Sequence, residues 1–244
     1  MKTNLLLSLL TVMLSVSGCR VNIGDNAEII DPSENIVRAK YPLKAFDKVE
    51  NHVVGNIQLV QSAKSRVTLS APDNYIDFFE FKDEDGKLKI EYAKDKNLNI
   101  SAEHINIIIY TPTLQEIDNA GAANICLDSL TTDEFEIKNS GVGEFDLAKV
   151  MVRKIDVSNR GVGSIRLSGQ ADEAEYSCSG VGSIHAKEMK ARETKAKVSG
   201  VGSIDCYASE SIEGQVSGVG GLNYAGHPAK KDLHHSMTGG IKEL

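Results

Sequence analysis

Hydrophobic and polar positions alternate through the second half of the chain, in units that recur about every 20 residues. Each unit contains a short glycine-rich motif, which reads Ser-Gly-Val-Gly in most copies. The first glycines of these motifs are Gly121, Gly141, Gly161, Gly180, Gly200 and Gly218, at intervals of 20, 20, 19, 20 and 18 residues. A fixed period with a retained turn motif predicts a solenoid, in which each repeat stacks on its neighbours.

The alternation within each unit has a period of two, which predicts β-strands. Ile165 and Leu167 follow a glycine motif and would share one face of a strand, and Ile155 and Val157 precede the motif in the same way. Two short strands with their turns in about 20 residues leave too little chain for a helical crossover between parallel strands. We therefore expect an all-β fold, a right-handed parallel β-helix with about 20 residues per coil, over residues 119–244.

The glycine-rich turns have a physical reason to recur. Glycine reaches positive φ without a Cβ clash, and stacked turns bring the backbones of neighbouring coils close together. The valine between the two glycines would stack on the valine of the next coil. The column before the turn contains Asn119, Asn139 and Asn159, which predict a ladder of amide hydrogen bonds, and continues with Cys178, Val198 and Val216.

Two columns of outward-facing residues are the candidate binding surface. The column on the strand after the turn consists of Asp146, Arg166, His185, Asp205 and Asn223. The column on the strand before the turn consists of Glu136, Asp156 and Glu175. Neighbouring side chains in such columns would stand about 5 Å apart. We interpret the three stacked acids as a solvated acidic face, with weak cation binding as the alternative.

Neither column contains the set of unlike groups that a catalytic site needs. His185 beside Asp205 resembles a base with its orienting carboxylate, but no nucleophile is placed to use them, because Cys206 would point inward. The cysteines Cys126, Cys178 and Cys206 lack the short spacing of a zinc site, and their odd number is not a disulfide framework. We therefore expect no catalytic residue, no metal site and no cofactor.

A different β region precedes the repeats, over residues 46–118. Residues 79–81 and 88–92 flank an Asp-Gly pair, Asp85 and Gly86, and predict a hairpin. Residues 105–110 predict a further strand, which a proline ends. We expect this region to cap one end of the solenoid, because an open end would expose strand edges to other chains.

The first 18 residues predict an export signal. Lys2 supplies a positive charge, and the apolar stretch over residues 5–16 is shorter than the about 20 residues of a membrane-spanning helix. The stretch ends in Val16-Ser17-Gly18-Cys19, which resembles a bacterial lipobox, whose cysteine is lipidated. We expect Cys19 to become a lipidated N-terminus that anchors the chain to a membrane, with residues 19–45 as a flexible tether.

Composition restricts the class of partner. The chain has 244 residues, of which 41% are hydrophobic and only 5% aromatic, and its formal net charge is −7. A chain of this length can bury a substantial core without disulfides. Binding to nucleic-acid phosphates needs an excess of lysine and arginine, so we expect no nucleic-acid partner.

Three features together resemble a known family. They are a strand with a Thr-Pro end at residues 109–114, the serial Ser-Gly-Val-Gly-Ser-Ile units, and a Tyr-Xaa-Gly-Xaa-Pro segment from Tyr224 to Pro228. An exported chain with this combination is similar, over about residues 45–244, to the family described as putative auto-transporter adhesin, head GIN domain. The resemblance implies an all-β fold like a β-helix and a location in the cell envelope, and it brings no catalytic residues.

We interpret the chain as a non-enzymatic lipoprotein that presents a solenoid surface for binding or adhesion. The alternative is a carbohydrate-active enzyme or a glycan-binding protein that uses the acidic column. The repeats offer few aromatic side chains on which sugars could stack, and this favours the first interpretation. We expect attachment to the outer membrane through Cys19, with the domain facing the periplasm or the cell surface. The partner would be an unidentified protein or glycan, and a homo-oligomer is left open.

Overall fold

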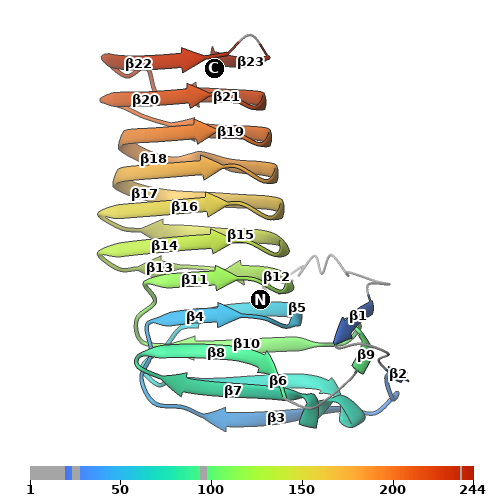
Figure 1. Ribbon diagram of the computed structural model, residues 1–244. Helices are drawn as coiled ribbons and strands as arrows, with labels where there is room; N and C mark the ends of the chain where they lie inside the picture. Colours follow the sequence, from blue (N-terminus) through green and yellow to red (C-terminus); the bar gives the residue numbers. More distant parts are fainter. Residues whose placement is uncertain (1–19, 24–27, 94–97, 237) are drawn as a thin grey trace, which may run out of the picture.

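A computed structural model describes residues 20–23, 28–93, 98–236 and 238–244. The export signal and Cys19 lie outside the described residues. The chain is nearly all β, with 71% of residues in strands, and the described residues contain a short 3-10 helix, η1 (Asp73–Phe78). The strands stack into a tall solenoid that stands on a broader N-terminal region (Figure 1).

The solenoid is made of short parallel strands. They are β4 (Lys48–Asn51), β5 (Val54–Gln61), β11 (Glu116–Asn119), β12 (Ala122–Leu127), β13 (Leu130–Thr131), β14 (Glu134–Asn139), β15 (Val142–Met151), β16 (Lys154–Asn159), β17 (Val162–Cys178), β18 (Val181–Val198), β19 (Val201–Tyr207), β20 (Ser211–Val216), β21 (Val219–Ala225), β22 (Lys230–His235) and β23 (Gly239–Glu243). The N-terminal region contains β1 (Arg20–Ile23), β2 (Glu28–Ile30), β3 (Ile36–Pro42), β6 (Arg66–Pro72), β7 (Phe79–Glu84), β8 (Lys87–Tyr92), β9 (Leu98–Ser101) and β10 (Asn106–Thr111).

Two parallel ladders of strands run the length of the solenoid. The strands before the glycine turn follow the order β4, β11, β14, β16, β17, β18, β20 and β22. The strands after the turn follow the order β5, β12, β15, β17, β18, β19, β21 and β23. The long strands β17 and β18 bend around a corner and contribute to both ladders. The predicted β-solenoid is confirmed, with about 6 turns that are about 20 residues apart.

The stack of coils begins earlier than the repeat motif predicts. β4 and β5 form a coil directly below β11 and β12, in which Asn51 pairs with Asn119 and Gly55 with Ala123. The boundary that we expected at residue 119 therefore lies inside the solenoid. The motif did not identify this coil because Val53 stands where the later coils have their first glycine.

The N-terminal region covers the lower end of the solenoid, as predicted. β8 pairs in parallel with β4, and β10 pairs in parallel with β5, so that each ladder gains one further layer. Beyond this layer the pairing becomes antiparallel, between β7 and β8, β6 and β10, and β3 and β6. The predicted hairpin is β7–β8, which turns at Asp85 and Gly86, both at positive φ.

The strand β3 corrects the expectation of a flexible tether over residues 19–45. It runs antiparallel to β6 from Ile36 to Pro42, and β1 and β2 pair with β9 in a separate small sheet. The side chains of β3 alternate only between exposed and partly buried positions. This weak contrast in burial is typical of an edge strand. The sequence does alternate there, because Val37, Ala39 and Tyr41 are separated by Arg38 and Lys40, and the expectation of a tether missed this signal.

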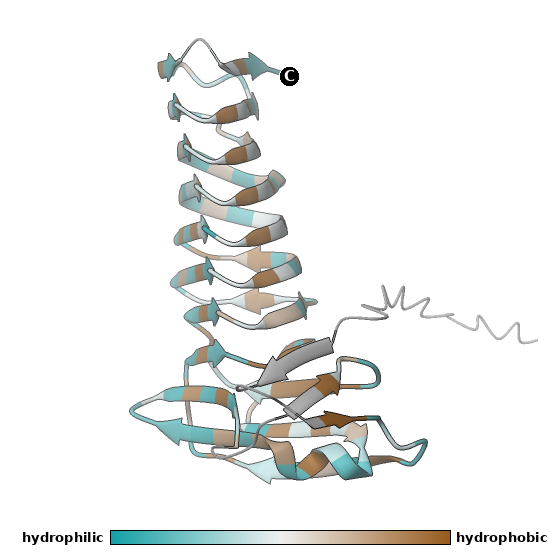
Figure 2. Ribbon diagram, turned by 45° about the vertical axis from the view of Figure 1, so that its right-hand side comes forward, coloured by the Kyte–Doolittle hydropathy of each residue, from teal (hydrophilic) through white to brown (hydrophobic). Residues whose placement is uncertain are grey.

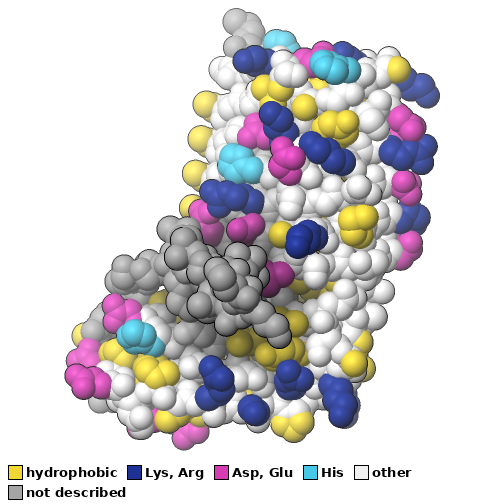
Figure 3. Space-filling view, turned by 180° about the vertical axis from the view of Figure 1, so that it is seen from behind, with side chains coloured by type: hydrophobic (Ala, Val, Ile, Leu, Met, Phe, Trp, Pro, Cys, Tyr) yellow, Lys and Arg dark blue, Asp and Glu magenta, His cyan; other side chains and the backbone are white. Residues whose placement is uncertain are grey.

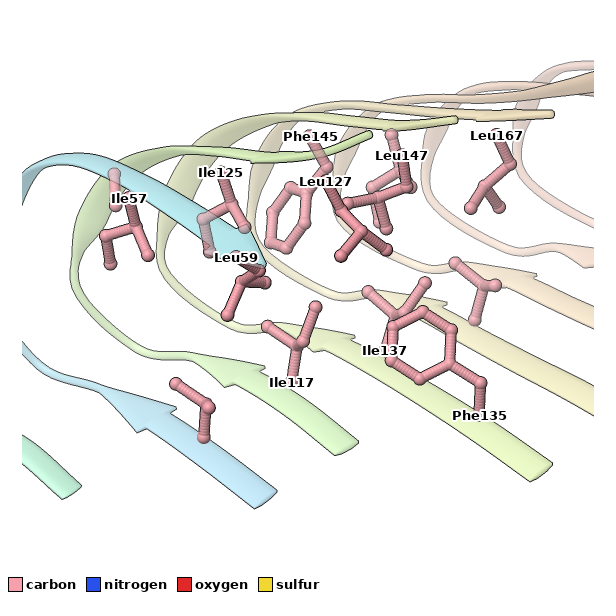
Figure 4. Packing of buried hydrophobic residues seen from close by; sticks show 14 of the residues in the cluster. Ile57, Leu59, Ile117, Ile125, Leu127, Phe135, Ile137, Phe145, Leu147 and Leu167 are labelled. Carbon is pink, nitrogen blue, oxygen red and sulfur yellow. The ribbon is translucent and has the colours of Figure 1, made fainter. Parts of the chain in front are cut away.

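The core consists of columns of hydrophobic side chains, one from each coil. Ile125 lies between Ile57 and Phe145 in one column, and Leu127 lies between Leu59 and Leu147 in the next (Figure 4). All of these side chains are buried. Hydrophobic bands therefore recur at the same place in successive coils (Figure 2). Burial at about 25 cal/mol per Å² makes this continuous column the main source of stability, since no coil can bury its inner face alone.

The predicted amide ladder is present, and it is one coil longer than expected. Nδ2 of Asn51 donates to Oδ1 of Asn119 at 2.8 Å, and the bonds from Asn119 to Asn139 and from Asn139 to Asn159 are both 3.0 Å long. The last amide, that of Asn159, donates to the carbonyl oxygen of Gly163 at 2.9 Å. Because every one of these buried amides donates a hydrogen bond, the ladder avoids the penalty for unpaired polar groups in a core.

The two glycines of each turn are required for different reasons. A Cβ on Gly161, a first glycine, would lie 2.0 Å from the carbonyl oxygen of Gly141 in the coil below. A Cβ on Gly163, a second glycine, would lie 1.9 Å from the carbonyl oxygen of Gly143, and Gly163 also has a φ of +126°. Positive φ occurs at the second glycines from Gly163 upward, but not at Gly143. The close approach of the neighbouring backbone alone fixes the first glycines.

The variant Gly163→Ala tests the packing of the stacked turns. We expect its free energy of unfolding to fall by roughly 2–4 kcal/mol, because the new Cβ meets a backbone carbonyl and the backbone is strained. Urea unfolding followed by circular dichroism measures this change. Gly240→Ala is the matched control, since a Cβ there has nothing within 4 Å, and we expect a change below about 0.5 kcal/mol. Equal losses in the two variants would contradict the close packing of the turns.

Candidate functional site

The column that we predicted after the turn is one continuous row of side chains, here named the mixed ladder. It consists of Asp146 on β15, Arg166 on β17, His185 on β18, Asp205 on β19 and Asn223 on β21. Each of these residues pairs in register with the next. One polar side chain therefore stands on each of five successive coils.

Hydrogen bonds and ion pairs orient the mixed ladder. Nη1 of Arg166 lies 3.1 Å from Oε2 of Glu144 in the coil below. Oδ1 of Asp205 accepts a hydrogen bond from Nδ2 of Asn223 at 2.7 Å, and Oδ2 of Asp205 lies 2.9 Å from Nδ1 of His185. These pairs are solvent-accessible, so each contributes less than about 1 kcal/mol to stability. The same accessibility leaves the groups available to a ligand.

A hollow lies beside the mixed ladder, and one of the coils that line it is a residue short at the adjoining corner. The register of β17 with both β15 and β18 shifts by one residue at Ser168. At this corner β15 and β18 each have one residue more than β17. The additional residues lie at Lys149 in β15 and at Lys187 in β18. This is the structural origin of the 19-residue interval between Gly161 and Gly180. The corner recedes there, between two longer coils.

The hollow has a volume of about 480 Å³ and extends along the solenoid. It is lined by Asp146, Arg166, Leu167, Ser168, His185, Lys187, Glu188, Asp205, Asn223 and Leu244. The buried Leu167 supplies an apolar floor, and the other groups are mostly polar side chains of both charges. Figure 3 shows side chains of both charges and histidine interleaved on one face of the solenoid.

The hollow offers hydrogen-bond donors and acceptors, but its described residues contain no activated nucleophile. The hydroxyl groups of Ser183 and Ser203 bond to each other at 3.0 Å. Cys206 points inward, as predicted, and burial raises its pKa to about 12, so that its thiol stays protonated. Ser168 also lines the hollow, and its Oγ accepts a hydrogen bond from the backbone N–H of Lys149 at 3.4 Å. Among the described residues, the ring of His185 hydrogen-bonds to Asp205 and to no hydroxyl or thiol group. This chemistry suits the binding of polar groups better than bond cleavage.

The column that we predicted before the turn is also in register and is here named the acidic ladder. Glu136 on β14 pairs with Asp156 on β16, which pairs with Glu175 on β17. Burial, together with the negative charges of Glu175 and Glu136, raises the pKa of Asp156 above its ordinary value. Above Glu175 the column is no longer purely acidic. Lys195 and Glu213 stand on the next two coils and form an ion pair of 3.7 Å.

A second hollow, of about 310 Å³, lies at the acidic ladder. It is lined by Lys48, Gln115, Glu116, Glu134, Phe135, Glu136, Lys154 and Asp156. Lysines are thus mixed with the carboxylates, and Lys138 lies 2.9 Å from Glu136. Across the described residues, no group of three or more His, Cys, Asp or Glu side chains is arranged to hold a metal ion.

A third row, which the sequence analysis missed, alternates in charge along another corner. Its members on successive coils are Asp133, Arg153, Asp172, Arg192 and Glu210. Arg153 lies 3.2 Å from Asp133, and Arg192 lies 3.6 Å from Asp172 and 2.8 Å from Glu210. The members of this row recur with the same period of about 20 residues as the glycine motifs. The sequence therefore contained the signal, at the corner positions between the paired strand segments. Stacked opposite charges stabilise neighbouring coils, which gives this row a structural role.

The sequence matches that of a known protein family. The sequence model of the family described as "Putative auto-transporter adhesin, head GIN domain" matches residues 45–228. The chain belongs to this family. The head GIN match begins just before β4 and ends just after β21, so it includes both the mixed ladder and the acidic ladder.

Several solved structures are similar to this head GIN chain. A protein of Bacteroides fragilis NCTC 9343, described as a putative adhesin, is 34% identical with a TM-score of 0.84, over 88% of this chain and 100% of that one. A Parabacteroides distasonis ATCC 8503 protein, described as a putative lipid binding protein, is 20% identical with a TM-score of 0.69, over 89% and 100%. A putative adhesin of Parabacteroides merdae ATCC 43184 is 18% identical with a TM-score of 0.62, over 89% and 100%. The last two show the fold alone. Among curated proteins, none matches the chain significantly.

The predicted lipid anchor concerns a part of the head GIN chain that lies outside the described residues. Cys19 and the export signal belong to that part, so lipidation stays a prediction. Across the described residues, no helix has the length and hydrophobicity that crossing a membrane requires.

The variant Asp156→Asn tests the acidic ladder. The raised pKa means that the native state binds the proton more tightly than the unfolded state, so the charged carboxylate destabilises the fold at neutral pH. We expect the variant to be more stable than the parent chain by about 0.5 kcal/mol at pH 7. This advantage should disappear as the pH falls through the raised pKa and the parent carboxyl becomes neutral. Urea unfolding at pH 7 and pH 4 measures the difference.

The control for this variant is Glu213→Gln in the same column. Glu213 lies beside Lys195 rather than between acids, so its neutralisation should give no gain at pH 7. A loss of stability in Asp156→Asn at pH 7 would contradict the unfavourable stacking of like charges.

Proposed function

We propose that the chain is a non-enzymatic binding protein of the cell envelope that holds an extended polar ligand, a protein or a glycan, along the mixed ladder. The observation that supports this proposal is the row of five polar side chains in register beside a hollow that extends along the solenoid. Membership of a family described as a putative adhesin is consistent with it.

The spacing of the mixed ladder favours an extended ligand. Its side chains are one coil apart, about 4.8 Å, so a ligand that runs along the solenoid would meet a new polar group at every coil. A globular ligand would contact only part of such a row. The rigid stack also holds the groups in place before binding, which lowers the entropy cost of forming many weak contacts.

The groups of the mixed ladder favour a polar ligand. Arg166 can donate hydrogen bonds, Asp146 and Asp205 can accept them, and His185 and Asn223 can do either. The row contains both positive and negative groups, so neither a polyanion nor a polycation would find a complementary row. Hydroxyl, amide and mixed-charge groups match this arrangement.

A carbohydrate-active enzyme is the weaker candidate. Stacked carboxylates about 5 Å apart have the separation seen in retaining glycosidases. In such enzymes, however, the two carboxyl groups flank the bond that is broken. Glu136, Asp156 and Glu175 point from one face in one direction, and Lys138 engages Glu136 at 2.9 Å. The acidic ladder therefore lacks the geometry of an acid and a nucleophile on either side of a substrate.

The triple variant Arg166→Ala, His185→Ala, Asp205→Ala tests the proposed binding surface. We expect its affinity for ligands found with the parent chain, on a panel of envelope polysaccharides and extracellular proteins, to fall at least about tenfold. Biolayer interferometry measures this change. The reason is that the variant removes a cation, a carboxylate and an imidazole from the mixed ladder and leaves the core intact.

The matched control is the double variant Lys195→Ala, Glu213→Ala, which removes an exposed ion pair from the other ladder. It should bind as the parent chain does, and both variants should keep the parent unfolding midpoint. Retained binding in the triple variant would overturn the assignment of the mixed ladder. Release of sugar products by the parent chain, lost in Glu136→Gln with Asp156→Asn, would favour the enzyme instead.

The variant Cys19→Ser tests the location. Two acyl chains hold a soluble domain on a membrane, because each buried CH₂ contributes about 0.8 kcal/mol. We therefore expect the variant to leave the membrane fraction of expressing cells, as measured by sedimentation and immunoblotting. Cys126→Ser, which changes an exposed thiol of the solenoid, should stay in the membrane fraction. Unchanged retention of Cys19→Ser would refute lipid anchoring.

A further inference from the structure

A row of exposed valines forms a ridge along the glycine turns, here named the valine ridge. Its members are Val142, Val162, Val181, Val201 and Val219, which pair in register from coil to coil and are 49–60% exposed. Figure 3 shows hydrophobic side chains in a row along the left-hand edge of the solenoid. A glycine on either side of each valine leaves its side chain protruding. Contiguous exposed apolar patches of this kind mark interaction sites on soluble proteins.

The two flanks of the valine ridge differ in charge. On the flank before the turn, the charged residues nearest to the ridge are the cations Lys138, Arg160 and Lys197. On the flank after the turn they include the carboxylates Glu144, Asp146 and Asp205. That flank also carries Arg166, whose guanidinium is already paired with Glu144 at 3.1 Å. Lys138 is likewise paired, with Glu116 at 3.1 Å and with Glu136 at 2.9 Å. The residues nearest to the ridge are thus mainly cations before the turn and mainly carboxylates after it.

We propose that the valine ridge is the contact surface for a second copy of this chain, in a parallel two-fold dimer. Valines on one ridge recur once per coil, about 4.8 Å apart, and a second ridge of the same period can pack against them at the same heights over its whole length. A partner with another period would match at only one or two positions. The second copy therefore fits this surface better than an unrelated protein.

The charges of the flanks select the parallel arrangement. A two-fold axis along the solenoid sets the basic flank of one copy against the acidic flank of the other, at the same height. Lys138 then faces Glu144 and Asp146 of the second copy, and Lys197 faces Asp205. A two-fold axis across the solenoid would instead set basic flank against basic flank. The parallel dimer also directs both N-termini the same way, which suits two chains anchored in one membrane.

The dimer should be weak. A single ridge is narrow, and it buries less than the about 800 Å² per partner that is typical of stable complexes. Two chains tethered to one membrane would nevertheless meet at a high local concentration. The valine ridge thus joins copies side by side, and the charge contacts of the dimer involve Asp146 and Asp205, which also line the hollow.

Sedimentation velocity tests the dimer, using the full chain with Cys19→Ser and Cys126→Ser. These changes remove the thiol expected to be lipidated and the exposed thiol, whereas Cys178 and Cys206 are buried. We expect a monomer–dimer equilibrium between about 10 μM and 1 mM, and a dissociation constant at least about tenfold higher in the triple variant Val162→Thr, Val181→Thr, Val201→Thr. Threonine keeps the shape of valine, so the turns should stay folded. Met151→Thr, an exposed apolar residue away from the ridge, should leave the dissociation constant unchanged.

Disulfide trapping tests the orientation of the dimer. In the parallel dimer Val142→Cys lies next to the same residue of the second copy, so mild oxidation should give a covalent dimer of this variant alone. A mixture of Val142→Cys and Val219→Cys chains that cross-links only between the two variants would overturn the parallel arrangement. A chain that stays monomeric at all concentrations, or a triple variant that dimerises as the parent does, would overturn the ridge as a self-association surface. Binding of the ridge to phosphatidylcholine vesicles without dimerisation would also overturn it.

Discussion

Every coil of this solenoid makes the same bend at the same height, because the turns touch one another through their backbones. The carbonyl oxygen of one turn glycine occupies the place that a Cβ of the next would fill. This contact leaves no freedom to slide one coil over another. The hydrophobic columns, the asparagine ladder and the outward rows are therefore all consequences of one steric constraint at the turn.

The period of the sequence was sufficient to predict the architecture, because each strand must repeat the pattern of its neighbours. It also placed the members of the mixed ladder and the acidic ladder on the correct strands. The coil of β4 and β5 was missed because Val53 replaces a glycine. The strand β3 was missed although Val37, Ala39 and Tyr41 alternate with Arg38 and Lys40, because this short run lies outside the repeats. The hollow was missed because the spacing of motifs does not say at which corner a coil is short or how the side chains at that corner pack.

The surfaces of the solenoid differ in what their side chains do for the fold. The row from Asp133 to Glu210 alternates in charge and holds its own coils together. In the acidic ladder, burial and the like charges of Glu175 and Glu136 raise the pKa of Asp156, so the charged form of this side chain opposes folding. The valine ridge exposes apolar surface along a whole edge. The rows thus differ from one another in charge and hydrophobicity, although all of them follow the same period of about 20 residues.

The shortened coil at Ser168 has a consequence for how such a protein changes over time. Removing one residue at a corner leaves the strands on both sides in register. The deletion therefore changes the shape of the surface without changing how the coils pair with one another. A repeat array of this kind can gain, lose or relocate a recess by the gain or loss of one codon. Related chains can therefore share a scaffold while presenting their recesses at different heights, each beside a different pair of side chains.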